Sequence, residues 1–106
     1  MIYEILMYQL YENQGSDFHE IMISESLPLH KQWNIDVVYA ANSLADSDNY
    51  ILVRRFADSF AYKQVLSDFY DSAAWRSEVR NKIVSRIKLS TTVVLDETDF
   101  LKQMCG

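Results

Sequence analysis

The chain switches between the two-residue period of strands and the longer period of helices, most sharply in residues 49–76. Residues 50–56 are rich in aromatic and branched side chains, which favour a strand whose successive side chains point to opposite faces. Both faces are mostly apolar, and each carries one arginine, Arg54 or Arg55. Residues 57–59 then supply helix-capping side chains, so the pattern predicts a strand that leads directly into a helix.

Two helices are expected after that strand. The apolar stripe of the first consists of Tyr62, Val65, Leu66 and Phe69. Asp71 and Ser72 are suited to cap the second helix. Its apolar side consists of Trp75, Val79, Ile83 and Ile87. Both stripes follow the spacing of an amphipathic helix, so we expect each helix to pack its apolar side against a sheet.

The amino-terminal third predicts a strand, a turn and a helix. Residues 2–10 alternate as a strand whose face with Glu4 and Tyr8 is the more polar. Residues 13–16 form the turn, and Ser16 is a plausible N-cap. The apolar stripe of the helix consists of Phe18, Ile21, Met22 and Leu29. Because Pro28 lacks a backbone donor, the helix should kink or end early, near Leu27.

Two further strands complete the pattern. Residues 35–41 predict a second strand, and the polar residues 42–49 predict its hairpin connection to the strand at 50–56. The branched residues of 89–95 predict a fourth strand. Residues 96–106 either form a helical turn around Phe100 and Leu101 or lie across a neighbouring chain.

This order of elements predicts one α+β domain over residues 1–106, with a ferredoxin-like fold: a four-stranded antiparallel sheet with helices on one face. Several strands are apolar on both sides, so the second face of the sheet needs a cover. Because symmetric dimers dominate soluble oligomers, the expected cover is the sheet of a second copy. The expected partner is therefore the chain itself, in a homodimer or a larger oligomer built from it.

Charge and composition narrow the partners further. A net charge of −5 argues against nucleic acid. No apolar run approaches the roughly 18 residues of a membrane span. The single cysteine, Cys105, permits no internal disulfide, fits a cytoplasmic location, and is poorly placed for a nucleophile. The basic residues of 76–88 suggest a solvated helix face or, alternatively, a docking patch.

Five segments together resemble the NIPSNAP family of the dimeric α+β barrel superfamily. They are residues 2–5 (IYEI), 27–33 (LPLHKQW), 52–56 (LVRRF), 69–76 (FYDSAAWR) and 91–95 (TTVVL). The resemblance implies a homodimer whose sheets face each other around a barrel-like cavity, as in the antibiotic biosynthesis monooxygenases. The first strand of this family often reads Tyr-Glu-Leu-Arg-Thr-Tyr, whereas Leu6 and Met7 occupy the Arg and Thr positions here. An anionic ligand held by that arginine is therefore not expected at this position.

Six residues are candidates for a ligand site. Glu4, Tyr8 and Arg54 are polar groups on strands that otherwise look buried, so they either satisfy one another or line a cavity. Trp33 and Trp75 either flank a flat ligand or belong to the core. His30, expected near the cavity mouth after Pro28, is the candidate for proton transfer, with an idle surface histidine as the alternative.

No metal or cofactor is expected. His19 and His30 are eleven residues apart, which places them about 16 Å apart along an unbroken helix. The acidic residues Asp96, Glu97 and Asp99 lack a calcium-loop pattern. Three functions remain open: binding of a small, partly apolar molecule, a cofactor-independent oxygenase or isomerase, and an interaction module without a ligand.

Overall fold

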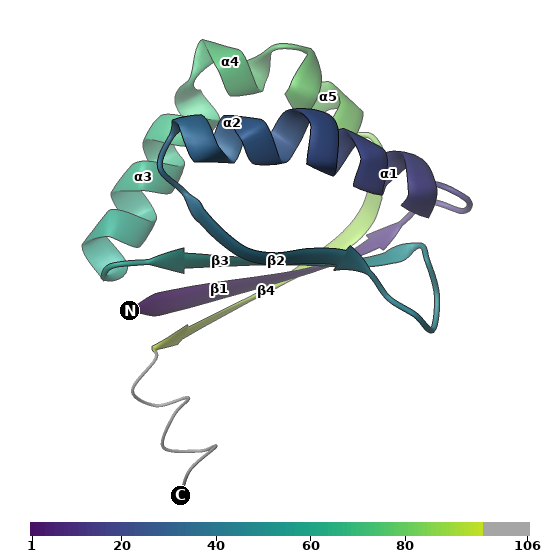
Figure 1. The fold of residues 1–106 in the computed structure, drawn as a ribbon, viewed down its shortest axis with the longest axis horizontal. Coiled ribbons are helices and arrows are strands. Elements are labelled where there is room, and N and C mark those ends of the chain that lie inside the picture. Colours follow the sequence, from purple (N-terminus) through teal and green to yellow (C-terminus); the bar gives the residue numbers. More distant parts are fainter. Residues whose placement is uncertain (97–106) are drawn as a thin grey trace, which may run out of the picture.

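The computed structural model describes residues 1–96, which form one antiparallel sheet with all helices on one of its faces (Figure 1). The elements are β1 (Ile2–Leu10), α1 (Gly15–Ile21), the π-helical turn η1 (Met22–Ser26), α2 (Leu27–Gln32), β2 (Asp36–Asn42), β3 (Asn49–Phe56), α3 (Ser59–Asp71), α4 (Ala73–Arg76), α5 (Glu78–Val84) and β4 (Ile87–Asp96). The strand order is β2-β3-β1-β4. The predicted ferredoxin-like α+β fold is thus confirmed.

The register of the two central strands decides which side chains meet under the helices. In the antiparallel pair of β1 and β3, Glu4 lies opposite Arg54 and Leu6 lies opposite Leu52. Side chains alternate between faces, so the even-numbered residues of β1 and β3 point towards the helices. The polar face predicted for residues 2–10 is therefore the buried one.

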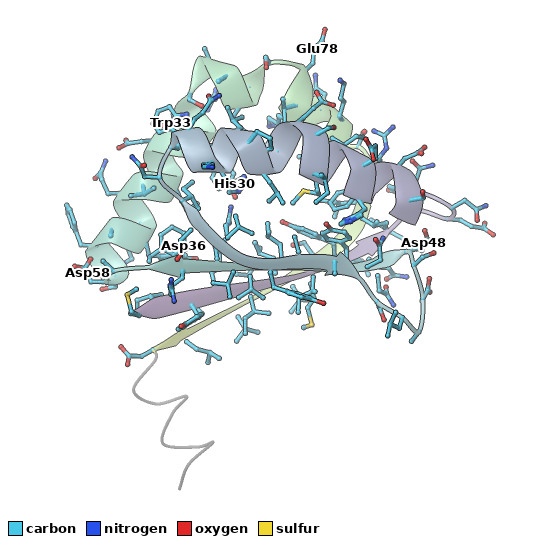
Figure 2. All side chains as sticks on the ribbon, viewed as in Figure 1. His30, Trp33, Asp36, Asp48, Asp58 and Glu78 are labelled. Atoms are coloured by element: carbon cyan, nitrogen blue, oxygen red, sulfur yellow. The ribbon has the colours of Figure 1, made fainter. Side chains whose placement is uncertain are left out.

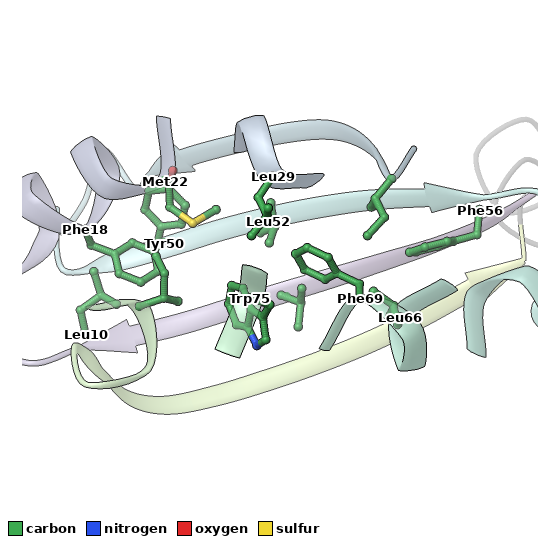
Figure 3. Close-up of a cluster of buried hydrophobic side chains, with 13 residues drawn as sticks. Leu10, Phe18, Met22, Leu29, Tyr50, Leu52, Phe56, Leu66, Phe69 and Trp75 are labelled. Atoms are coloured by element: carbon green, nitrogen blue, oxygen red, sulfur yellow. The ribbon is translucent and has the colours of Figure 1, made fainter. Parts of the chain in front are cut away.

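The core fills the space between the helices and this face of the sheet (Figure 3). Phe69 of α3 is fully buried near its centre. Its ring centroid lies 4.7 Å from that of His30, 5.3 Å from that of Trp75 and 6.2 Å from that of Trp33. Edge-to-face and tilted contacts of this kind add to the burial of apolar area. The aromatic side chains therefore join α2, α3 and α4 into one layer.

The other face of the sheet is open and largely apolar, with the exposed Arg55–Asp36 ion pair at one end. We call this surface the open face. Its apolar side chains are Tyr3, Ile5, Met7, Tyr39, Ile51, Val53, Leu89, Val93 and Leu95. No element among residues 1–96 covers it (Figure 1). Tyr39 is 59% exposed and Leu89 is 60% exposed. Contiguous apolar surface of this kind usually marks an interaction site.

The amino terminus of α1 is held by a distant loop rather than by its own cap. The helix begins at Gly15, so the prediction of Ser16 as the N-cap is wrong. Asp48, in the β2–β3 connection, accepts from the backbone N–H of Gly15 at 2.8 Å and of Asn13 at 2.9 Å. Asn42 adds a bond of 2.9 Å to the carbonyl oxygen of Gly15. This contact ties the first helix to the hairpin.

Gly15→Ala should lower the free energy of unfolding by about 2 kcal/mol or more. A Cβ at this position would overlap the backbone oxygen of Ser47, so the hairpin would have to move away from the helix. Urea unfolding measures the change. Ser16→Ala, at the exposed neighbouring position, should change stability by no more than about 0.5 kcal/mol. Equal effects of the two substitutions would contradict the close contact.

Pro28 predicts a kink or an early end near Leu27. The chain does not leave the helix there, but a π-helical turn interrupts the α-helix directly before it. Pro28 lies in the first turn of α2, where the missing N–H matters least. The turn before it is π-helical, because the N–H of Leu27 bonds to the carbonyl oxygen of Met22, five residues back. The helix then continues to Gln32.

The second of the two helices predicted after β3 is divided into two helices, α4 and α5. Ser72 caps α4 through a 3.2 Å bond from the N–H of Trp75, as predicted, but α4 and α5 are separate helices with Ser77 between them. Ile87, predicted on the helix, begins β4 instead. The predictions for Phe100, Leu101, Cys105 and the acidic residues Glu97 and Asp99 lie outside the described residues.

Candidate functional site

Glu4 and Arg54 form an ion pair that is almost completely buried. Arg54 donates from Nε to Glu4 Oε1 at 2.6 Å, and its Nη2 lies 2.5 Å from the same oxygen. The hydroxyl of Tyr62, on α3, donates to Glu4 Oε2 at 2.9 Å. Burial opposes the charge on Arg54, but Tyr70 and Glu4 outweigh it and raise its pKa. Both charges are therefore kept inside the protein by their partners.

His30 extends this ion pair to α2. It points from the helix towards the sheet (Figure 2) and is 2% exposed, so it is not at a cavity mouth. Its Nδ1 donates to the carbonyl oxygen of Ser26 at 2.7 Å, and Arg54 Nη1 donates to its Nε2 at 3.1 Å. These two bonds fix a neutral imidazole with the proton on Nδ1. We call Glu4, Arg54, His30 and Tyr62 the buried polar row.

The environment of His30 makes the stability of the fold depend on pH. Burial, and to a smaller extent the charge of Arg54, lower its pKa to about 4, although the bond to Ser26 acts in the opposite direction. Between about pH 4 and 6.5 the unfolded chain therefore holds a proton on this ring that the folded chain lacks. Stability consequently rises with pH across this window and is lost as the pH falls.

His30→Gln should flatten this pH dependence. Between pH 7 and pH 4 the free energy of unfolding should fall by about 3 kcal/mol more in the wild type than in the variant. Only the wild type has a buried imidazole that folding keeps neutral. Urea unfolding at half-unit pH steps measures both curves, and the carboxylates contribute equally to each. Parallel curves would show that the imidazole is not held neutral.

Above the buried polar row, three aromatic side chains line a hollow between the helices and the sheet. We call this the aromatic hollow; its volume is about 340 Å³. Its lining consists of Tyr8, Tyr70, Trp75, Arg76, Arg80, Ile83, Val84 and Ile87. The guanidinium carbon of Arg54 lies 5.7 Å from the ring centroid of Tyr70, so the hollow borders the row. Burial raises the pKa of Tyr8, which therefore remains a neutral phenol.

The structure brings most of the predicted site residues together, in two layers. Tyr8 and Trp75 line the aromatic hollow. Glu4, Arg54 and His30 lie in the row beneath it and satisfy one another. Trp33, at the end of α2, contacts Phe69 and is not part of the lining. Tyr62, Tyr70 and Arg80 were not among the predicted site residues, because helical spacing alone gave them no role beyond a stripe or a solvated face.

A second hollow lies on the open face, near the β2–β3 connection. Its volume is about 540 Å³, and its lining includes Met7, Gln9, Ile51, Leu89 and Thr91. Within residues 1–96, no three His, Cys, Asp or Glu side chains are grouped to hold a metal ion. No helix in the same residues is long and apolar enough to cross a membrane.

Known structures share this arrangement over nearly its whole length. A NIPSNAP family protein from Agrobacterium tumefaciens superposes with a TM-score of 0.83 at 13% identity, over 93% of this chain and 94% of that one. An uncharacterized NIPSNAP domain protein from Burkholderia xenovorans gives 0.81 at 14% identity, over 91% and 93% of the two chains. The chain has the NIPSNAP fold.

The fold is also similar to that of an antibiotic biosynthesis monooxygenase. A putative antibiotic biosynthesis monooxygenase from Nitrosomonas europaea superposes with a TM-score of 0.69 at 10% identity, over 91% of this chain and 97% of that one. Its lower TM-score places the chain nearer in fold to the NIPSNAP proteins. No protein-family model matches the sequence, and no curated protein is significantly similar to it. The resemblance found in the sequence is therefore supported at the level of fold.

Proposed function

We propose that the protein is a NIPSNAP-family homodimer that binds a small, partly apolar molecule. The open face supports the dimer, because two copies that meet there would remove Ile5, Val53 and Val93 from water. The aromatic hollow carries the proposal of a ligand. Ligand sites are typically concave and apolar, with a few polar groups that orient the ligand. The hollow combines three aromatic side chains with the buried polar row beneath it.

The dimer would leave the aromatic hollow accessible. The hollow lies on the helix side of the sheet, at Tyr8 and Ile87, whereas the proposed interface lies on the other side. The hollow on the open face would instead become enclosed between the two sheets. We place the ligand in the aromatic hollow because only this one contains a tryptophan and borders the buried ion pair.

Filling the aromatic hollow should abolish ligand binding without unfolding the protein. Val84 lines it and is 44% exposed, so Val84→Phe would occupy the space with little change to the core. Binding is measured with a panel of small aromatic compounds, by following the indole N–H signals of Trp75 and Trp33 in NMR spectra. Compounds that bind should move the Trp75 signal in the wild type, and the variant should bind at least tenfold more weakly.

Val38→Phe is the matched control for this experiment. Val38 is 48% exposed on β2 and lies outside the aromatic hollow. This variant should bind like the wild type. A Val84→Phe variant that binds equally well would place the ligand elsewhere, and a panel without any binding compound would favour an interaction module that has no ligand.

A cofactor-independent oxygenase is the second candidate, supported by the fold shared with the putative monooxygenases. Oxygen consumption with polycyclic phenols tests it. The binding function predicts no consumption above background. An oxygenase would consume oxygen, and if His30 transfers the proton, His30→Ala would stop the reaction. The cytoplasmic location expected from the single cysteine remains a prediction.

A further inference from the structure

The aromatic hollow lies in the most basic part of an acidic chain. Residues 76–88 contain five basic side chains and one acidic side chain, a net charge of +4, although the whole chain carries −5. The basic side chains are Arg76, Arg80, Lys82, Arg86 and Lys88. Such a local excess raises the concentration of anions near the surface, more strongly at low salt. The hollow is thus placed where an anion would be attracted.

Most of these cations already have a partner. Arg76 donates to Asp71 Oδ1 at 3.0 Å and to the carbonyl oxygen of Tyr70 at 3.1 Å. Lys82 donates to Glu25 Oε1 at 3.0 Å. Arg86 Nη1 donates to the carbonyl oxygen of Lys82 at 2.8 Å. These bonds engage the donors of all three side chains, and for Arg76 and Lys82 the partner is a carboxylate.

Arg80 differs from Arg76, the other cation of this segment that lines the hollow. It lies on α5, lines the aromatic hollow, and has no hydrogen bond or ion pair to any residue of the described part of the chain. Its guanidinium offers a fork of donors that fits a carboxylate. The other lining cation, Arg76, is held by Asp71. The hollow therefore contains one guanidinium whose donors are available to a ligand.

The remaining walls favour a flat, apolar body. Tyr8, Tyr70 and Trp75 present ring surfaces, and Ile83 and Ile87 add aliphatic area. The charge of Arg54 beneath them is already balanced by Glu4, so the floor contributes no net attraction to a second anion. The charge of a ligand would therefore be recognised by the arginines of the lining, and its shape by the aromatic side chains.

We infer that the aromatic hollow takes a planar aromatic anion, with a carboxylate or similar group bound to Arg80 and the ring against Tyr8, Tyr70 and Trp75. This inference rests on the proposed ligand-binding function and names its ligand class. The ligand is therefore distinguished by its charge as well as by its shape.

The test compares two probes of the same shape, 2-naphthoate and the neutral 2-naphthamide. Each is titrated into the full chain, and the indole N–H signal of Trp75 gives the dissociation constant, with Trp33 as the internal reference outside the hollow. A Trp33→Phe variant assigns the two signals. The anion should bind at least about tenfold more tightly than the amide, since a charge-assisted hydrogen bond replaces a neutral one. This preference for the anion should become smaller as the salt concentration is raised.

Arg80→Gln should remove the preference while the affinity for 2-naphthamide stays within about twofold of the wild type. Lys63→Gln is the matched control, because Lys63 is an exposed cation of α3 outside the hollow, and it should keep the preference. Equal binding of the two probes to the wild type would overturn the anion inference and leave the ligand site intact. Failure of both probes to move the Trp75 signal would overturn the inference together with the proposed site.

Discussion

Replacing Arg54 by methionine should destabilise the fold by about 3 to 5 kcal/mol, the largest loss we expect from a single substitution outside the apolar core. The variant leaves the Glu4 carboxylate 3% exposed with only the Tyr62 hydroxyl as a partner. It also removes the donor that occupies Nε2 of His30. A buried charge without its counter-ion costs much more than a lost contact.

Urea unfolding at pH 7 measures this loss of free energy, and thermal unfolding should give a melting temperature lower by about 12 °C or more. Arg55→Met is the matched control on the same strand. Arg55 pairs with Asp36 at 2.6 Å, but their side chains are 39% and 50% exposed, so solvent screens this pair and its loss should change stability far less than the loss of Arg54.

A double variant, Glu4→Leu with Arg54→Met, should recover much of the stability, because it removes the unpaired charge as well. A double variant that is less stable than Arg54→Met would show that the carboxylate is not the source of the loss. Similar losses in Arg54→Met and Arg55→Met would show that the burial of the pair does not matter.

Ile5→Lys should raise the dissociation constant of the proposed homodimer by a factor of about 100 or more, since a lysine would be buried between two apolar sheets. Ile5 lies at the centre of the open face, opposite Val53 on one side and Val93 on the other. In a single chain the same lysine would be solvated, so the fold of the monomer should be nearly unchanged.

Sedimentation velocity over a range of concentrations separates these effects, and circular dichroism reports on the fold. Ile23→Lys is the matched control: Ile23 is 49% exposed on the π-helical turn, away from the open face, and this variant should remain dimeric. A wild-type protein that stays monomeric at high micromolar concentration would contradict the proposed dimer.

The strands could be predicted from the sequence because their signal is local. Residues 2–10 are a run of mainly aromatic and aliphatic side chains, and the strand predicted from them matches β1 at both ends. The beginning of the first helix could not be predicted in the same way. Its cap comes from Asp48, 33 residues beyond Gly15, and Ser16 looked adequate because nothing near it reveals that contact. Pro28 predicts a kink or an end of the helix near Leu27, but a proline alone does not predict that the irregularity is a π-helical turn.

The candidate site was predictable only in part. Glu4 and Arg54 were recognisable as polar residues on apolar strands, and mutual satisfaction was one of the two interpretations considered; the structure shows this contact. The role of His30 depends on the angle at which α2 crosses the sheet, which no spacing rule gives. Arg80 looked like one cation among five, and it is distinguished only by its place in the lining of the aromatic hollow together with the partners of Arg76 and Lys82.

The link between Asp48 and the start of α1 also bears on how the molecule opens. The N–H groups of Asn13 and Gly15 bond to a carboxylate that is in place only while the β2–β3 hairpin is closed. Their hydrogen exchange with solvent should therefore report on the opening of the hairpin rather than on fraying of the helix end. Two segments more than 30 residues apart would then melt as one cooperative unit.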